Sequence, residues 1–307
     1  MTRRILLTGA HGFLGRHLRA RLEGSGDELL CPTRSELDLL DFHATKAFFT
    51  KRAVTHAIHA AGFVGGIGLN EAHPGRMATE NLRMGLNVLE GASQGGKAHV
   101  TIVSTICVYP EKAPVPIAES SVYEGYPAPA TAPYGLAKRE LLSVAEALSR
   151  ESDLTFAYVI PTNLYGPGDH FDEAKSHVVP ALIRRAIEAR RNEVKEIVVW
   201  GDGTATRDLL FVTDAARAIG ETLDRGHGRP INISSGREIS IRELAETICE
   251  LTGYGGQLVW DKTKPAGAPR RTLDTTLARE LIGFSPEVDI RDGLRRTIAW
   301  YTGTQPP

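Results

Sequence analysis

Three glycines near the N-terminus constrain this chain most, because they predict a tight turn directly after an apolar strand. The apolar run 5–7 leads into Gly9, Gly12 and Gly15, and a helical pattern begins at residue 13. Glycines at this spacing let the chain turn sharply and let a pyrophosphate approach the N-terminus of the helix. The segment therefore predicts a dinucleotide-binding turn. The residues that we expect to contact the cofactor here are Gly9, His11, Gly12, Phe13, Leu14 and Gly15.

Short apolar segments then alternate with helical patterns. The predicted buried strands are 5–7, 28–31, 57–60, 100–103 and 157–160, and the predicted helices are 13–23, 43–51, 77–93 and 134–150. Such alternation indicates a parallel sheet covered by helices on both faces. The predicted fold class is α/β, a doubly wound parallel sheet of the Rossmann type with a smaller, discontinuous α/β substrate lobe.

From Pro161 onward, Gly and Pro become frequent, and the chain is expected to leave the sheet there. The later predicted elements are a helix from Val178 with Pro180 in its first turn, a strand at 197–199, a helix at 213–223, a strand at 231–233 that returns to the first lobe, a helix that Ser240 caps, and a helix at 289–301. The dinucleotide-binding domain is accordingly predicted at 1–167 and 208–236. The nucleotide-sugar lobe is predicted at 168–207 and 237–307.

Composition excludes several function classes. The chain has 307 residues and a formal net charge of −1, without a long basic run, which argues against a nucleic-acid or membrane surface. Its three cysteines have neither paired spacing nor a matching set of histidines, so no disulfide framework and no metal site is expected. These features favour a cytoplasmic protein that binds small molecules.

The end of the second predicted strand bears on the choice of cofactor. A site for NAD usually carries a carboxylate there, which holds the ribose 2′-hydroxyl. Here the strand ends Cys31-Pro32-Thr33-Arg34, and the guanidinium of Arg34 is suited to a 2′-phosphate. We therefore predict NADPH/NADP+ as the cofactor, although the nearby Glu36 leaves NADH open.

A hydroxyl residue, a tyrosine and a lysine form the predicted reaction centre. Tyr134 and Lys138 are four residues apart, so they lie on one face of a helix, and Thr105 follows the fourth strand. We expect the Lys138 ammonium to lower the pKa of the Tyr134 phenol, which becomes the proton donor to a carbonyl oxygen. Lys138 would also hold the nicotinamide ribose, while Thr105 orients the oxygen.

Cys107 and His177 are two further candidates. Cys107 follows Thr105 at the mouth of the sheet, where a ligand is expected, and His177 precedes the first helix of the second lobe. A thiolate with a lowered pKa can act as a base. A small thiol beside a buried strand is also an ordinary core residue, and both interpretations stay open on the residues alone.

At these positions the chain resembles the extended short-chain dehydrogenase/reductase superfamily. Within it, the chain is similar to the fucose synthase branch, whose members act on GDP-4-keto-6-deoxy-mannose as 3,5-epimerases and 4-reductases. The resemblance covers nearly the whole chain, and the segments that carry it are 60–67, 107–110, 161–167, 176–185 and 199–204.

The resemblance implies roles for further residues. Cys107 and His177 would be the acid and base of the epimerisation, and Tyr134 would be the acid of the reduction. Additional cofactor contacts would be Leu39, Ala60, Ala61, Lys138, Pro161, Asn163, Leu164 and His177. Contacts to the nucleotide sugar, with GDP as the expected nucleotide, would be Gly65, Asn163, Val178, Arg185, Trp200, Arg207 and Arg270. A homodimer through a four-helix interface is also implied.

Two departures from the family pattern leave alternatives open. Thr105 stands where the family commonly has serine, and Phe63 replaces a basic residue that we expect beside the sugar. The alternatives are a 4-ketoreductase of a related GDP- or dTDP-linked deoxyhexose or heptose without epimerisation, an NAD-dependent sugar 4-epimerase, and a non-catalytic dinucleotide sensor. A 4,6-dehydratase is disfavoured because no carboxylate follows Thr105.

Overall fold

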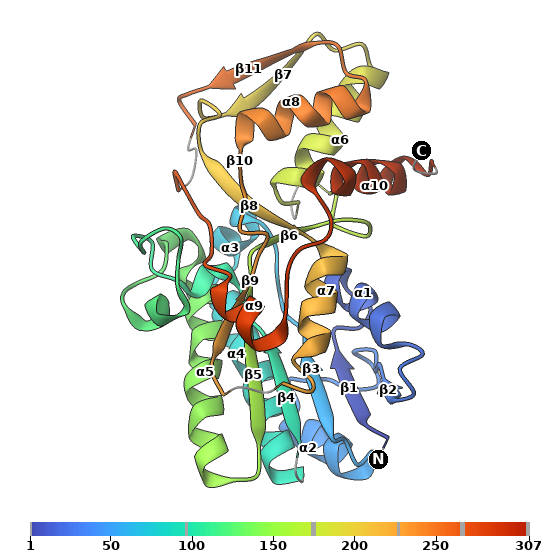
Figure 1. The fold of residues 1–307 in the computed structure, drawn as a ribbon, viewed down its shortest axis with the longest axis vertical. Coiled ribbons are helices and arrows are strands. Elements are labelled where there is room, and N and C mark those ends of the chain that lie inside the picture. The colour runs from blue at the N-terminus through green and yellow to red at the C-terminus, as the bar shows by residue number, and fades with distance from the viewer. Residues whose placement is uncertain (1, 96–97, 173–175, 226–227, 265–267, 305–307) are drawn as a thin grey trace.

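A six-stranded parallel sheet forms the larger lobe of the molecule (Figure 1). The structure is a computed structural model that describes residues 2–95, 98–172, 176–225, 228–264 and 268–304. The strand order is β2-β1-β3-β4-β5-β9. The bounds are Arg4–Thr8 for β1, Glu28–Leu30 for β2, His56–His59 for β3, His99–Val103 for β4, Thr155–Pro161 for β5 and Pro230–Ile233 for β9. The five predicted strands are confirmed, and β9 returns beside β5 as expected.

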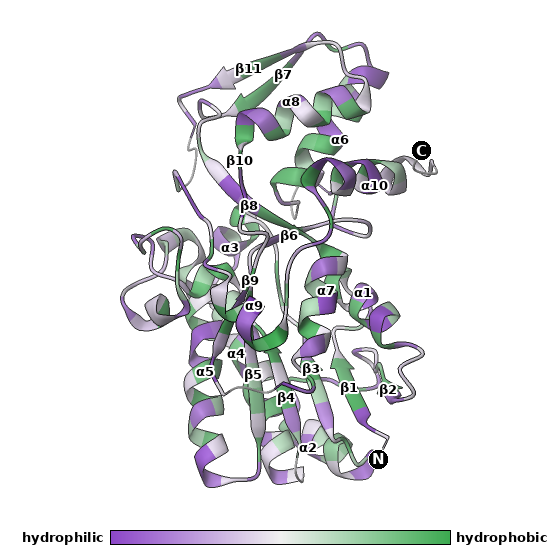
Figure 2. Ribbon diagram, viewed as in Figure 1, coloured by the Kyte–Doolittle hydropathy of each residue, from purple (hydrophilic) through white to green (hydrophobic). Residues whose placement is uncertain are grey.

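Helices cover both faces of this sheet. The helices α2 (Phe42–Lys51), α4 (Pro74–Gly95) and α5 (Ala132–Glu151) pack on one face, and α1 (Phe13–Leu22) and α7 (Val212–Glu221) pack on the other. The strands are apolar on both sides for this reason. In β1, Leu6 faces the α4 and α5 side while Ile5 and Leu7 face the α1 and α7 side, and all three are fully buried. Figure 2 shows hydrophobic segments along the strands, interrupted by polar residues, and helices that carry both colours.

The smaller lobe lies beyond the carboxyl ends of the strands (Figure 1). It contains the parallel pair β11-β7, and the three-stranded sheet β10-β8-β6 lies between this pair and the main sheet. The bounds are Asn163–Tyr165 for β6, Glu196–Trp200 for β7, Thr206–Phe211 for β8, Glu238–Ser240 for β10, Gln257–Asp261 for β11, Val178–Arg191 for α6, Ile241–Thr252 for α8 and Ile290–Thr302 for α10. The Ser240 side chain accepts from the Glu243 amide at 3.0 Å, so the predicted cap of α8 is confirmed.

Several elements had not been predicted: β6, β8, β10, β11, α3 (Ile67–Ala72) and α9 (Thr276–Ile282). The strand β6 lies between prolines and glycines, and β8 runs directly into α7. The predicted domain boundary at 207 falls inside β8, and that at 167 falls just after its partner β6. The domain division therefore stays a prediction.

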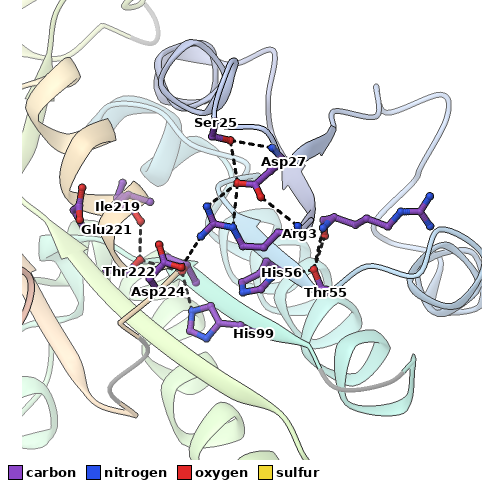
Figure 3. A network of polar contacts seen from close by, with 12 residues as sticks. Arg3, Ser25, Asp27, Thr55, His56, His99, Ile219, Glu221, Thr222 and Asp224 are labelled. Atoms are coloured by element: carbon purple, nitrogen blue, oxygen red, sulfur yellow. Dashed lines mark hydrogen bonds and ion pairs between the residues drawn. The ribbon is translucent and has the colours of Figure 1, made fainter. Parts of the chain in front are cut away.

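Polar side chains close the amino edge of the main sheet (Figure 3). The Arg3 guanidinium pairs with Asp27 and with Asp224, each at 2.6 Å, and the hydroxyls of Thr101 and Thr222 are 3.0 Å apart. The hydrogen bond from Arg3 is the main reason why the pKa of Asp27 falls to about 2. Since the network occupies the amino edge, the carboxyl edge is the place for a ligand.

Candidate active site

The glycine turn after β1 has the close packing that a dinucleotide site needs. Gly9 adopts a φ of +72°, and a Cβ there would lie 2.8 Å from the Ala61 amide nitrogen. A Cβ at Gly15 would lie 1.9 Å from the Gly9 carbonyl oxygen. Side chains are excluded at both positions, so the backbone at the start of α1 stays open to a phosphate.

A cavity of about 280 Å³ opens beside this turn. The predicted cofactor residues that line it are Gly9, His11, Gly12, Arg34, Leu39 and Ala61. Its position between the glycine turn and the end of β2 fits the adenosine half of a dinucleotide. The other predicted cofactor contacts do not line this cavity and stay predictions; they are Phe13, Leu14, Gly15, Ala60, Lys138, Pro161, Asn163, Leu164 and His177.

The acidic residue near the end of β2 is engaged elsewhere. The Glu36 carboxylate accepts from the Thr33 amide at 2.7 Å and from the Thr33 hydroxyl at 2.8 Å. These hydrogen bonds lower the pKa of Glu36. Glu36 is thus held in its own turn, while Arg34 faces the cavity, and this arrangement suits a 2′-phosphate.

Sequence reasoning missed several residues of this cavity, namely Leu37, Asp38, Glu80 and Met84. The sequence signals that could have indicated them were the helical spacing of Glu80 and Met84 and the position of Asp38 next to Leu39. Phe63 lines the same cavity, and the Arg76 guanidinium lies 4.2 Å from the centre of its ring; its place beside the sugar stays a prediction.

The reaction centre forms where the end of β4 meets the start of α5. The Thr105 hydroxyl accepts from the Cys107 amide at 3.2 Å and caps a short 3-10 turn. A Cβ at Gly135 would lie 2.2 Å from the Cys107 carbonyl oxygen, so α5 contacts this turn directly. The structure therefore brings Thr105, Cys107, Tyr134 and Lys138 together.

Tyr134 and Lys138 are both buried, with 9% and 2% of their surface exposed. Burial and the neighbouring Cys107 raise the pKa of the Tyr134 phenol, and burial lowers the pKa of Lys138 to about 8. The expectation that Lys138 lowers the pKa of Tyr134 is wrong here, because burial dominates and the ammonium donates to the Val103 carbonyl at 3.1 Å. A phenol with a raised pKa stays protonated, which is the form that a proton donor requires.

Hydrogen bonds of Tyr158 fix the helix backbone that carries Lys138. The Tyr158 hydroxyl accepts from Ser104 at 2.6 Å and donates to the Lys138 carbonyl at 2.8 Å. Tyr158 is fully buried in β5. The bonds connect β4, β5 and α5, so the backbone that carries Lys138 is fixed relative to the end of the sheet.

His177 lies on the other lobe, at the N-cap position of α6, and Val178 begins that helix. The residue is exposed, and the surrounding protein and the nearby His170 lower the pKa of His177. The imidazole is neutral at pH 7, so it can accept a proton.

The predicted sugar-nucleotide contacts lie in both lobes. Arg185 on α6 donates to the Val198 carbonyl, and Trp200 at the end of β7 is 61% exposed. Gly65 lies in the loop before α3 and packs against Leu69 of that helix. Arg207 donates to the Ala268 carbonyl at 2.8 Å.

Arg270 points away from the reaction centre, whereas its neighbour Arg271 points toward it. Arg270 pairs with Glu238 at 2.7 Å, beside a separate cavity. Arg271 donates to the Ile106 carbonyl at 2.9 Å, and its Nε is buried without a hydrogen-bond partner among the described residues. Burial and the charge of Arg271 lower the pKa of Arg207, so the two guanidiniums are close enough to interact.

Two features are not found in the part of the chain that the structure describes. No helix there is long and apolar enough to cross a membrane. No group of three His, Cys, Asp or Glu side chains there could hold a metal ion.

Comparisons with known proteins agree with this geometry. The NAD dependent epimerase/dehydratase family matches residues 5–234. The chain is 36% identical to a GDP-L-fucose synthase of Escherichia coli (strain K12), over 98% of this chain and 97% of that protein. It is 38% identical to GDP-L-fucose synthase 1 of Arabidopsis thaliana, over 97% and 93% of the two chains. A crystal structure of a GDP-L-fucose synthetase from Naegleria fowleri bound to NADP superposes with a TM-score of 0.90, at 27% identity and over 99% and 95% of the chains.

Proposed function

The chain belongs to the NAD dependent epimerase/dehydratase family, and we propose that it reduces the 4-keto group of a GDP-linked 4-keto-6-deoxy sugar with NADPH and epimerises carbons 3 and 5. The observation that carries the proposal is the contact of the Thr105–Cys107 turn with the first turn of α5. It places a hydroxyl, a thiol and a protonated phenol at one point of the sheet edge.

The cofactor site fits NADPH. The glycine turn leaves backbone for the pyrophosphate, and Arg34 faces the adenosine cavity while Glu36 does not line it. NADPH supplies a hydride to carbon 4 of the sugar when it is bound. Lys138 has one N–H on the Val103 carbonyl, and its remaining N–H groups are available to the nicotinamide ribose.

In the reduction, the Tyr134 hydroxyl donates its proton to the oxygen on carbon 4 while Thr105 orients that oxygen. The raised pKa of Tyr134 keeps it protonated until the oxygen becomes basic. The positive charge of Lys138 stabilises the phenolate that remains. The ketone thus gains a hydride at carbon and a proton at oxygen.

In the epimerisation, the neutral imidazole of His177 removes a proton from the carbon beside the ketone. The electron pair moves onto the oxygen, and the Tyr134 hydroxyl stabilises this enolate. The Cys107 thiol returns a proton on the opposite face, which inverts the carbon. The diphosphate of the substrate is held by Arg207 and Arg271, whose guanidiniums lie close together.

The test is a turnover assay of purified protein with NADPH, comparing GDP-4-keto-6-deoxy-mannose with a dTDP-linked 4-keto-6-deoxy sugar. We expect NADPH oxidation with the GDP sugar and a loss of at least 100-fold in Tyr134→Phe, since a positioned general acid contributes on the order of 100-fold or more. Oxidation with the dTDP sugar alone would contradict the nucleotide assignment. A Tyr134→Phe variant with full activity would contradict the proposed proton donor.

We also propose a cytoplasmic homodimer that buries the outer faces of α4 and α5. These two helices pack closely, since a Cβ at Gly85 would lie 2.3 Å from the Leu141 side chain, so they would present one surface to a second copy. Light scattering tests it: a monomer mass that does not change with concentration would exclude the dimer.

A further inference from the structure

The residue Glu80 lies in the lining of the adenosine cavity, which also contains Arg34. Glu80 and Met84 line the cavity from α4, one helical turn apart and therefore on the same face of that helix. Arg34 and Asp38 line it from the segment after β2. The cavity thus has one arginine and two carboxylates in its lining, and the proposed function assigns no role to Glu80.

Glu80 is held in place by a neighbour outside the cavity. The Arg76 Nε donates to the Glu80 carboxylate at 2.8 Å, and the Arg76 guanidinium lies 4.2 Å above the ring of Phe63. Phe63 also lines the cavity, so the ring, the guanidinium and the carboxylate form one cluster along its wall. The Glu80 side chain is 22% exposed and therefore has few alternative positions.

The charge of Glu80 acts on the groups that face the cofactor. The hydrogen bond from Arg76 is the main cause of the lowered pKa of Glu80, and the charges of Arg76 and Arg34 lower it further, whereas Asp38 raises it. Glu80 is therefore ionised at neutral pH, and its field reaches Arg34. Arg76 offsets part of that negative charge from behind.

NADPH and NADH differ only in the 2′-phosphate, which carries close to two negative charges at pH 7. Arg34 attracts this group, but a carboxylate in the same cavity repels it. We propose that Glu80 is a specificity-determining residue that weakens the preference for NADPH over NADH, so that NADH is also accepted as reductant. This inference rests on the proposed function only in taking a nicotinamide dinucleotide as the ligand.

The experiment measures dissociation constants of NADP+ and NAD+ by titration calorimetry, without any sugar substrate. For Glu80→Gln we expect NADP+ to bind about tenfold more tightly, because the variant removes one negative charge from the cavity lining and with it a repulsion of the doubly charged 2′-phosphate. NAD+ should bind as it does to the unaltered protein. Arg76→Gln, which leaves the carboxylate unopposed, should weaken NADP+ binding and not NAD+ binding.

Two further variants separate charge from fold. Glu80→Asp keeps the charge and should keep the ratio of the two constants. Asp292→Asn removes a comparable i,i+4 ion pair, with Arg296 at 2.6 Å on α10, outside the cavity, and should change neither constant.

The inference is overturned if Glu80→Gln leaves the ratio of the two constants unchanged or if Glu80→Asp changes it as much as Glu80→Gln does. If the unaltered protein binds neither dinucleotide, the proposed function fails instead. Binding of both without any effect at Glu80 would leave the proposed function standing and refute this inference alone.

Discussion

Replacement of Gly135 by alanine tests whether the contact between α5 and the Cys107 turn organises the reaction centre. The new Cβ would lie 2.2 Å from the Cys107 carbonyl oxygen and 2.9 Å from its carbon, whereas ordinary contacts begin at 3.4 Å. Both neighbours are backbone atoms, so neither can rotate away. The start of α5 or the turn must therefore move by about 1 Å, which displaces Tyr134 relative to Thr105.

A displacement of about 1 Å can lower the rate of a positioned reaction by about 100-fold. Overpacking of this kind should also lower the free energy of unfolding by about 1–3 kcal/mol. Gly293→Ala is the matched control, because its Cβ would lie 2.1 Å from the Tyr165 hydroxyl in the smaller lobe, away from the reaction centre.

The assay compares kcat for NADPH oxidation and the denaturant midpoint of both variants. We expect both proteins to be destabilised and only Gly135→Ala to lose most of its kcat. The reasoning is refuted if Gly135→Ala keeps more than half of kcat at a similar loss of stability.

Three further predictions address charge. Because the pKa of Lys138 is lowered to about 8, its ammonium is lost as pH rises, so kcat should fall above about pH 8; a rate that is flat up to pH 10 contradicts this. Asp27 has a pKa of about 2, below its usual value, so its pairing with Arg3 stabilises the protein above about pH 4, and this gain disappears as pH falls toward 2. Asp27→Asn should therefore lower the free energy of unfolding by about 1 kcal/mol at pH 7, after allowance for solvent screening, and leave it unchanged near pH 2. Urea unfolding measures this difference, and equal curves for the two proteins at pH 7 would refute the prediction. Arg271→Gln should raise KM for the sugar nucleotide at least tenfold, as expected for a lost charged hydrogen bond, while Arg270→Gln should change KM little. A larger increase in KM for Arg270→Gln than for Arg271→Gln would contradict the orientations of these two side chains.

The main sheet could be predicted because its strands are buried on both faces and read as continuous apolar runs. The strands of the smaller lobe carry less of that signal, and among them only β7 matches a predicted strand, 197–199. The strand β7 alternates between buried and exposed residues, and β11 is at most half-buried, so their pairing depends on contacts far apart in the sequence. The strand β6 is short and lies between prolines, so its sequence shows no clear strand pattern.

In the candidate site, too, some positions could be predicted from the sequence and others could not. Tyr134, Lys138, Thr105 and Cys107 meet because strand ends and helix starts converge at one edge, which the order of the elements already implies. Whether Arg270 or Arg271 faces the reaction centre depends on the orientation of an extended segment, in which neighbouring side chains point to opposite sides. The sequence does not give that orientation. Glu80 could not be placed because its position depends on the packing of α4 against the segment after β2.

The most direct test of the central claim is turnover of GDP-4-keto-6-deoxy-mannose with NADPH in heavy water, with NMR of the product. The unaltered protein should oxidise NADPH and yield a product with deuterium at carbons 3 and 5. Cys107→Ser should still oxidise NADPH, but its product should keep the substrate's configuration at carbons 3 and 5. Oxidation by the unaltered protein without deuterium at either carbon would contradict the assigned roles of Cys107 and His177 and would leave a 4-ketoreductase.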